Sequence, residues 1–238
     1  MSSATYTKLL TDPLRIPHEL LTPLSSILLY AELVIDEEPN NLSHREITPM
    51  ARSIQSAAHR LLETIHKYLL YNELQILRFT ERKSKLREIQ DNLHDIILHT
   101  GRAVAGKWKR QEDLREILGD SAVRACIPYF CHVVRQLVDN ACKFSPIGSP
   151  ITLQYFKSNG EVTLSIKDQG RGISTEDTKR LGAFQQFERN RYEQQGSGLG
   201  LAIVKHILEY NRGTLNIQSV PNEGTTVTVT FPITAESE

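Results

Sequence analysis

The sequence predicts an α+β protein in which a helical hairpin precedes a layer of helices packed on a sheet. Apolar residues recur at alternating steps of three and four over residues 20–35 and again over 47–69, the periodicity of amphipathic helices. Four later segments are rich in β-branched residues and alternate with period two, at 151–156, 162–168, 214–219 and 225–231. Helices gathered on one side of a mixed or antiparallel sheet are typical of an α+β fold.

The composition is that of an ordinary globular chain. Its 238 residues are 39% hydrophobic and 24% charged, which suits one large domain or two small ones. Lys plus Arg and Asp plus Glu both number 28, so no overall charge attracts nucleic acid or an anionic membrane. No apolar run is long enough for membrane insertion. The three cysteines match no zinc or disulfide spacing, and we expect a cytoplasmic protein.

The two N-terminal helices are expected to dimerise. Pro17 disfavours helical geometry at the residue before it, so the first helix is predicted to begin near His18, and Pro and Asn residues break the pattern over 36–43. Two helices cover only part of each other's apolar stripe. The remainder must meet another surface, most simply a second copy, which predicts a homodimeric four-helix bundle built on residues 13–79.

The start of the first helix displays a histidine to solvent. The helical period places His18 and Thr22 together on the polar face, with Glu19 beside them, and Pro23 is expected to bend the helix one turn further on. Unpaired backbone N–H groups at a helix start favour an anionic group attached to the imidazole.

A polar stretch over residues 80–85 marks the predicted domain boundary. We expect one domain over residues 1–80 and a second over 81–238. The apolar spacing from Leu86 to Val104 predicts one helix of the second domain, and that of Tyr129 to Phe144 another.

Asp168, at the end of a predicted strand, is followed by Gly170 and Gly172. An acceptor carboxylate beside two glycines is able to hold an exocyclic amine while the backbone approaches a flat base closely. The polar segment over 174–195 that follows is long enough to act as a lid.

Two further groups suggest a phosphate and metal site. Gly196, Gly198 and Gly200 lead directly into an amphipathic helix, where free N–H groups can cradle phosphates. Asn140 and Lys143 lie within one turn of the same predicted helix and offer an oxygen ligand for Mg²⁺ and a cation for phosphate.

These segments together resemble the sensor histidine kinases of two-component signalling. Residues 18–24 resemble that family's phosphoacceptor box, 140–145 its asparagine box, 168–172 its first glycine box, 184–187 its phenylalanine box and 196–201 its second glycine box. Each match alone is weak. Five in this order after a helical hairpin are a strong match.

The resemblance implies a dimerising phosphotransfer hairpin followed by a Bergerat-type ATP-binding α/β sandwich. His18 would then attack the γ-phosphate, and Glu19 would hold or accept the imidazole proton. The family passes the phosphoryl group to an aspartate on the receiver domain of a response regulator. The spacing of Glu19 and Thr22 also resembles members that hydrolyse that phosphate, with the threonine orienting water.

The implied ligands are ATP and Mg²⁺. Asn140 would ligate the metal, Lys143 would meet phosphate and Asp168 would accept from the adenine amino group. The resemblance assigns the full nucleotide set to Asn140, Lys143, Phe144, Asp168, Gly170, Gly172, Phe184, Phe187, Gly196, Gly198 and Gly200. Phe184 and Phe187 read equally well as lid anchors or as plain core residues.

Three positions depart from the family pattern, and alternatives stay open. Gln136 stands where Asn is common, Leu21 where a basic residue is usual, and Pro17 where a small polar residue is usual. Few residues precede His18, so we expect a fragment of a longer protein or a kinase core that receives its input from a separate partner. One rival is an inactive phosphotransfer adaptor or scaffold that retains the fold. Another is a nucleotide-binding serine kinase, which an exposed His18 argues against.

Overall fold

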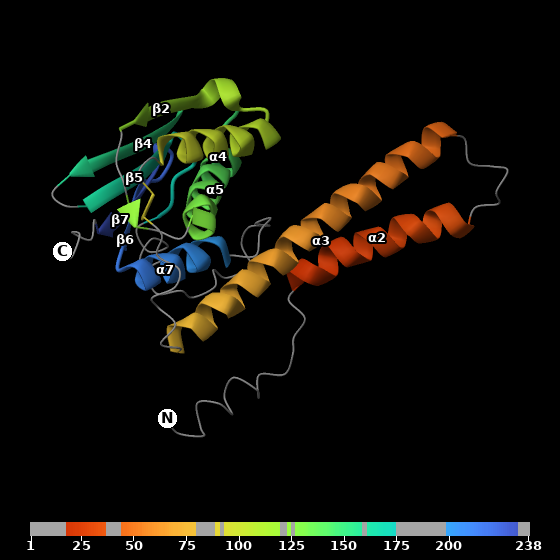
Figure 1. Ribbon diagram of the computed structural model, residues 1–238. Coiled ribbons are helices and arrows are strands. Elements are labelled where there is room, and N and C mark those ends of the chain that lie inside the picture. The colour runs from red at the N-terminus through yellow and green to blue at the C-terminus, as the bar shows by residue number, and fades with distance from the viewer. Residues whose placement is uncertain are drawn as a thin grey trace. The chain divides into compact units, whose positions relative to one another are not determined.

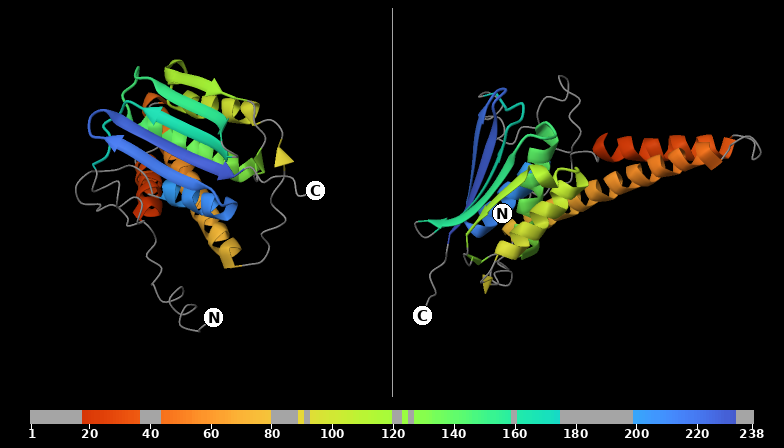
Figure 2. Two further views of the ribbon diagram at one scale, coloured as in Figure 1. Left: turned by 90° about the vertical axis from the view of Figure 1, so that its left-hand side faces the viewer. Right: turned by 90° about the horizontal axis from the view of Figure 1, so that it is seen from above.

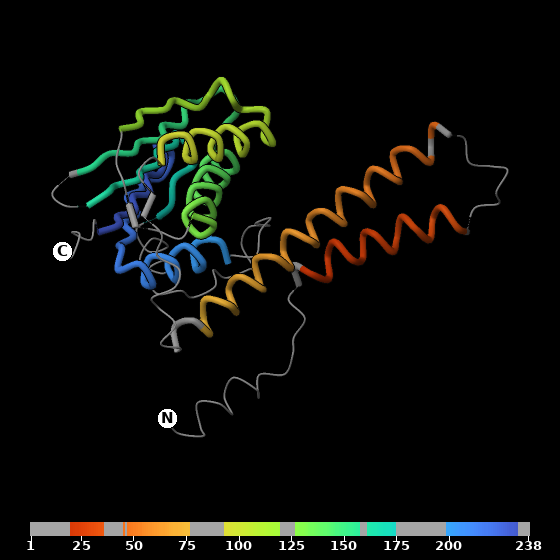
Figure 3. Tube along the Cα trace, viewed as in Figure 1, coloured from red at the N-terminus to blue at the C-terminus, as the bar shows by residue number. Residues whose placement is uncertain are grey.

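The computed structural model describes residues 18–36, 44–79, 89–90, 93–119, 123–124, 127–158, 161–174 and 199–232. The chain divides into two compact units, Met1–Leu69 and Leu70–Glu238, and the division falls inside one long helix. The path of the described segments can be followed along the Cα trace in Figure 3.

The first unit is a pair of helices. Helix α2 spans His18–Asp36 and runs antiparallel to α3, His44–Phe79, of which the part up to Leu69 belongs to this unit (Figures 1 and 2). The structure thus confirms the predicted helical N-terminal region, with α3 longer than expected. Pro23 lies inside α2 and is buried.

Most of the apolar stripe remains uncovered in the single chain. Ala57 is fully buried, but Leu24 is 41% exposed and Leu69 is 60% exposed. Other large apolar side chains of these helices are exposed as well, namely Leu21, Leu28, Leu29, Leu33, Ile35, Ile47, Leu62 and Ile65. Because such a continuous apolar surface is unfavourable in water, the hairpin is not a complete core by itself.

The second unit is built on a five-stranded mixed sheet. Its strands are β2 (Leu114–Leu118), β4 (Ile151–Ser158), β5 (Glu161–Asp168), β6 (Thr214–Val220) and β7 (Gly224–Pro232). Their order is β2-β4-β5-β7-β6, with β2 parallel to β4 and every other pairing antiparallel. All four strands predicted from alternation are therefore present.

Described helices cover one face of this sheet, as both views of Figure 2 show. They are α4 (His94–Lys107), α5 (Ile127–Phe144) and α7 (Leu199–Asn211). Phe130 of α5 lies at the centre of the core, where its ring meets those of Tyr155 and Phe231 at centroid distances of 6.4 and 5.4 Å. This one-sided layering confirms the α+β prediction.

The last turns of α3 pack within the second unit. Leu74 is 4% exposed and belongs to its apolar core. The Tyr129 hydroxyl donates to Glu73 Oε1 at 2.9 Å, and Gln75 Nε2 lies 2.8 Å from His206 Nε2 on α7. The end of α3 is thus anchored by both apolar and polar contacts.

The predicted start of one helix was wrong. The spacing from Leu86 suggests a helix, but α4 begins only at His94, and Ile89 lies in the short strand β1 (Ile89–Gln90). That strand pairs antiparallel with β3 (Val123–Arg124), with Ile89 opposite Arg124. A partner distant in sequence overrides the local apolar rhythm here.

Candidate nucleotide and phosphotransfer site

Helix α5 positions Asn140, Lys143 and Phe144 in its last turns. Its inner side is buried in the core, and its residues Val133, Val134, Leu137, Val138 and Ala141 are at most 2% exposed. This burial fixes the rotation of the helix, so Asn140 and Lys143 emerge at the partly exposed rim. The prediction that they share one turn is confirmed.

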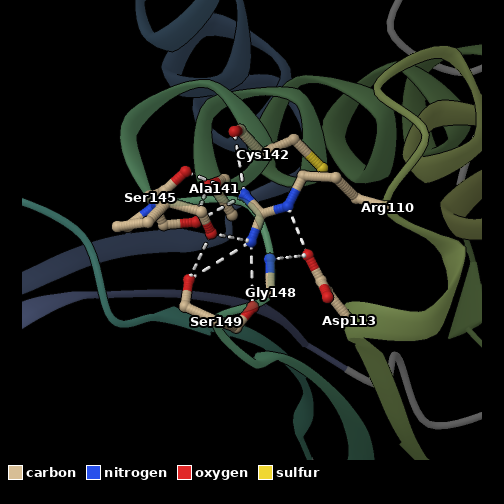
Figure 4. A network of polar contacts seen from close by, with 8 residues as sticks. Arg110, Asp113, Ala141, Cys142, Ser145, Gly148 and Ser149 are labelled. Atoms are coloured by element: carbon tan, nitrogen blue, oxygen red, sulfur yellow. Dashed lines mark hydrogen bonds and ion pairs between the residues drawn. The ribbon is translucent and has the colours of Figure 1, made fainter.

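A buried arginine completes the C-terminal end of α5 (Figure 4). Arg110 is 1% exposed, and its guanidinium pairs with Asp113 at 2.6 Å. The same guanidinium donates to the backbone carbonyls of Cys142, Ser145, Pro146 and Ser149 at 2.7–3.0 Å. Carbonyls at a helix end have no partner within the helix, and Arg110 supplies one.

The ion pair affects the acidity of its carboxyl group. The hydrogen bond from Arg110, followed by one from the Gly148 N–H, holds the pKa of Asp113 below its ordinary value. Arg110 does not stand out in the sequence because it lies in a mostly charged stretch, Lys107 to Asp113, of the kind that is typical of a solvated surface.

Asp168 ends β5 and is 7% exposed. Its Oδ1 accepts a hydrogen bond from the Gly170 N–H at 2.8 Å. Burial raises the pKa of Asp168, while the backbone N–H groups of Gly170 and Thr225 oppose that shift. A buried carboxylate with spare lone pairs is suited to an amine donor from a ligand.

The glycines after Asp168 allow the backbone to pack closely against two neighbours. A Cβ at Gly170 would collide with the carbonyl of Phe144, and one at Gly172, whose φ is +64°, would collide with the carbonyl of Val220. The Arg171 N–H donates to the Phe144 carbonyl at 3.3 Å. The structure therefore brings the Asp168 turn against the end of α5.

The aromatic ring of Phe144 lies beside two cations. Lys143 Nζ is 5.0 Å and Arg171 Cζ is 4.9 Å from the ring centroid. Such cation–π contacts hold positive charge at a defined place. Sequence reasoning did not single out Arg171, because only the structure places it over the aromatic ring.

The start of α7 approaches α5 through another glycine. Gly200 is buried in the first turn of α7, and a Cβ there would fall on the carboxamide of Gln136. The other predicted members at this end of the site, Phe184, Phe187, Gly196 and Gly198, lie outside the described residues.

The predicted phosphoacceptor residues lie in the first unit, at the start of α2. Helix α2 begins at His18, and the side chains of His18 and Glu19 lie outside the described residues. Thr22 is exposed, and its carbonyl accepts a hydrogen bond from Ser26 Oγ at 3.1 Å.

The donor set suits Mg²⁺ held together with a phosphate. Within the described residues, no group of three or more His, Cys, Asp or Glu could form a protein cage for a metal. Asn140 offers a single neutral oxygen at the rim of α5. Mg²⁺ commonly takes one or two protein oxygens and completes its shell with phosphate and water, so this residue fits the ion.

Known families match both units. Residues 15–76 match the His Kinase A (phospho-acceptor) domain, and residues 127–235 match the family of histidine kinase-, DNA gyrase B- and HSP90-like ATPases. The chain belongs to the two-component histidine kinases. Its ATPase match covers α5, the Asp168 turn and α7, which are the elements that the site residues share.

Individual relatives agree with this assignment. The histidine protein kinase DivJ of Caulobacter vibrioides is 30% identical over 91% of this chain and 36% of its own length. The sensor-like histidine kinase SenX3 of Mycobacterium tuberculosis is 27% identical over 93% of this chain and 53% of its own length. The kinase chain thus spans about half or less of these two curated relatives.

A solved structure shows the same fold. Histidine kinase AdeS of Acinetobacter baumannii superposes with a TM-score of 0.65, covering 92% of this chain and all of that chain, at 17% identity. Among the described helices of the kinase, none has the length and apolar character needed to cross a membrane.

Proposed function

We propose that this histidine kinase transfers the γ-phosphoryl group of ATP to His18 and then to an aspartate of a response regulator. The observation that carries the proposal is the junction between α5 and β5. There, the Arg171 N–H donates to the Phe144 carbonyl and Asp168 is buried beside the same loop. A base-binding carboxylate and a metal-binding amide on neighbouring elements are what a nucleotide kinase needs.

The chain's own residues would divide the work. Asp168 accepts from the adenine amino group, Asn140 ligates Mg²⁺, and Lys143 meets phosphate. Bound Mg²⁺ would neutralise charge on the phosphate chain. The remaining nucleotide contacts are proposed for Phe144, Gly170, Gly172, Phe184, Phe187, Gly196, Gly198 and Gly200.

The transfer step begins at the imidazole of His18. One ring nitrogen forms a bond to the γ-phosphorus, while the bond from that phosphorus to the bridging oxygen breaks and ADP leaves. Glu19 receives or holds the proton of the other ring nitrogen. The phosphoryl group then passes to a carboxylate oxygen on the receiver domain as the bond between phosphorus and the ring nitrogen breaks. Glu19 returns the proton, or continues to hold it on the ring, which leaves a neutral imidazole.

Homodimerisation is part of the proposal. The exposed apolar residues of α2 and α3, among them Leu24, Leu28 and Leu62, supply a surface whose burial would stabilise a four-helix bundle. For the reverse, phosphatase reaction, we propose that Thr22, which is exposed one turn after His18, orients the attacking water.

Incubation with γ-labelled ATP and Mg²⁺ tests the kinase proposal. We expect acid-labile, alkali-stable label on the wild-type chain and none on His18→Gln. Label that persists in that variant would place the acceptor elsewhere. Nucleotide binding without any label on the wild type would instead support the scaffold alternative. A Thr22→Ala variant should keep the label but lose the ability to dephosphorylate a phosphorylated receiver domain.

A further inference from the structure

Arg110 holds the backbone on both sides of two proposed nucleotide residues. Its Nη1 donates to the carbonyl of Cys142 at 2.9 Å, and to the carbonyl and the hydroxyl of Ser145 at 3.0 and 2.7 Å (Figure 4). Lys143 and Phe144 are the two residues between these contacts. One buried nitrogen therefore brackets the peptide units that carry both side chains.

The other two nitrogens of the guanidinium bind neighbouring segments. Nη2 donates to the carbonyls of Pro146 and Ser149 at 2.7 and 2.9 Å, and Nε donates to Asp113 Oδ2 at 2.6 Å. The same carboxylate oxygen accepts from the Gly148 N–H at 2.9 Å. Because a guanidinium is planar and rigid, bonds from all three nitrogens hold it, and the turn around it, in one orientation.

Phe144 is also held by the Asp168 turn. Its carbonyl accepts from the Arg171 N–H at 3.3 Å and lies where a Cβ of Gly170 would fall. The backbone that Arg110 brackets is thus also the surface on which the Asp168 turn rests.

We propose that Arg110 is a positioning residue of the nucleotide site, which fixes the end of α5 so that Lys143 and Phe144 meet the nucleotide. This inference rests on the proposed function. Arg110 is 1% exposed, so it acts through the backbone rather than by touching the ligand. Contact residues on a fixed backbone lose less conformational freedom when a ligand binds, which strengthens binding.

A positioning role and a merely structural role predict different measurements. If Arg110 only stabilises the fold, its replacement lowers the fraction of folded chains, so fewer nucleotide sites remain and each binds with unchanged affinity. If Arg110 positions Lys143 and Phe144, the folded chains themselves bind nucleotide with a higher dissociation constant. Titration of fluorescent trinitrophenyl-ATP in the presence of Mg²⁺ gives both the number of sites per chain and the dissociation constant.

The test compares Arg110→Lys with Leu74→Ala in the full chain. Lysine keeps the positive charge, but its one ammonium nitrogen cannot serve the α5 end, the following turn and Asp113 at once. For Arg110→Lys we expect the dissociation constant to rise about tenfold, which corresponds to the loss of about one contact with the ligand.

Leu74→Ala is the matched control, since it removes a buried side chain of the same unit that has no assigned nucleotide contact. It should lower the number of sites at most and leave the dissociation constant within about twofold of the wild-type value. An unchanged dissociation constant in folded Arg110→Lys would overturn the positioning role and leave the kinase proposal standing. A wild-type chain that does not bind trinitrophenyl-ATP would instead overturn the proposed function.

A second variant loosens the bracket without replacing Arg110. Asp113→Asn keeps the shape of the side chain but removes the charge that holds the guanidinium through Nε. The dissociation constant should rise about threefold, and Asp113→Asn should add little to the effect of Arg110→Lys in the double variant. Fully additive effects would overturn the claim that Asp113 acts through Arg110. Where Arg110→Lys fails to fold, Asp113→Asn decides alone, and an unchanged dissociation constant then overturns the positioning role.

Discussion

Replacing Arg110 with Met should destabilise the second unit strongly. The substitution retains an unbranched stem but removes the guanidinium bonds to the carbonyls of Cys142, Ser145, Pro146 and Ser149 and to the Asp113 carboxylate. A hydrogen bond to a charged group contributes about 1.5–3 kcal/mol, but these bonds share one guanidinium and do not add. Because several buried carbonyls lose a charged donor at once, we expect the free energy of unfolding to fall by about 3–5 kcal/mol.

The assay uses the single tryptophan of the chain. Trp108 lies two residues before Arg110, and its Nε1 donates to Asp139 Oδ1 at 2.9 Å, so its fluorescence reports unfolding of this unit. In urea titrations the midpoint for Arg110→Met should fall well below that of the wild type. The melting temperature should fall by about 6–20 °C, at about 2–4 °C per kcal/mol for a unit of this size.

Arg102→Met serves as the control. Arg102 pairs with Glu116 at 2.7 Å, but its side chain is 60% exposed, and water screens such surface pairs. We expect its midpoint to match that of the wild type. If Arg110→Met loses less than about 1 kcal/mol, water satisfies the freed carbonyls and the argument from burial is refuted.

Three further predictions concern other parts of the fold. Burial raises the pKa of Asp168, so the folded state favours the protonated acid, and the stability that this proton contributes is lost as pH rises through the raised pKa. At pH 7, Asp168→Asn should therefore increase the free energy of unfolding measured in urea titrations. The same substitution should weaken ATP binding. Burial also raises the pKa of Cys142 to about 11, so iodoacetamide at pH 8 should alkylate partly exposed Cys131 and spare Cys142, as peptide mass spectrometry would show. Leu74→Ala should lower the free energy of unfolding by about 2–4 kcal/mol, since Leu74 is buried in the second unit. Urea titration followed by Trp108 fluorescence measures this loss. An unchanged urea midpoint would mean that α3 does not anchor in the second unit.

The local pattern of apolar and polar residues was sufficient to predict much of the fold. Strands β4 to β7 alternate apolar and polar residues, because one face of their sheet meets helices and the other meets solvent. Strand β2 was missed, since its sequence Leu-Arg-Glu-Ile-Leu consists largely of good helix formers. It becomes a strand through parallel pairing with β4, whose residues lie more than thirty positions further along the chain.

Some residues of the candidate site can likewise be predicted from the sequence, whereas others are revealed only by the tertiary structure. Asn140 and Asp168 stand out because amide, carboxylate and glycine at particular spacings carry recognisable chemistry. Arg110 does not stand out, since its importance depends on carbonyls that only the tertiary structure brings to it, and Gln136 stands out only as a departure from the family pattern. A charged residue in a polar run looks the same in sequence whether it lies in water or in the core.

Helix α5 has a consequence for genetics. Its 18 residues contribute the central core side chains, such as Phe130, and also carry Asn140. Loss-of-function alleles recovered in this segment should therefore fall into two phenotypic groups. Those at Phe130 should be temperature-sensitive and rescued by growth in the cold, whereas those at Asn140 should be null at every temperature yet accumulate normal amounts of protein.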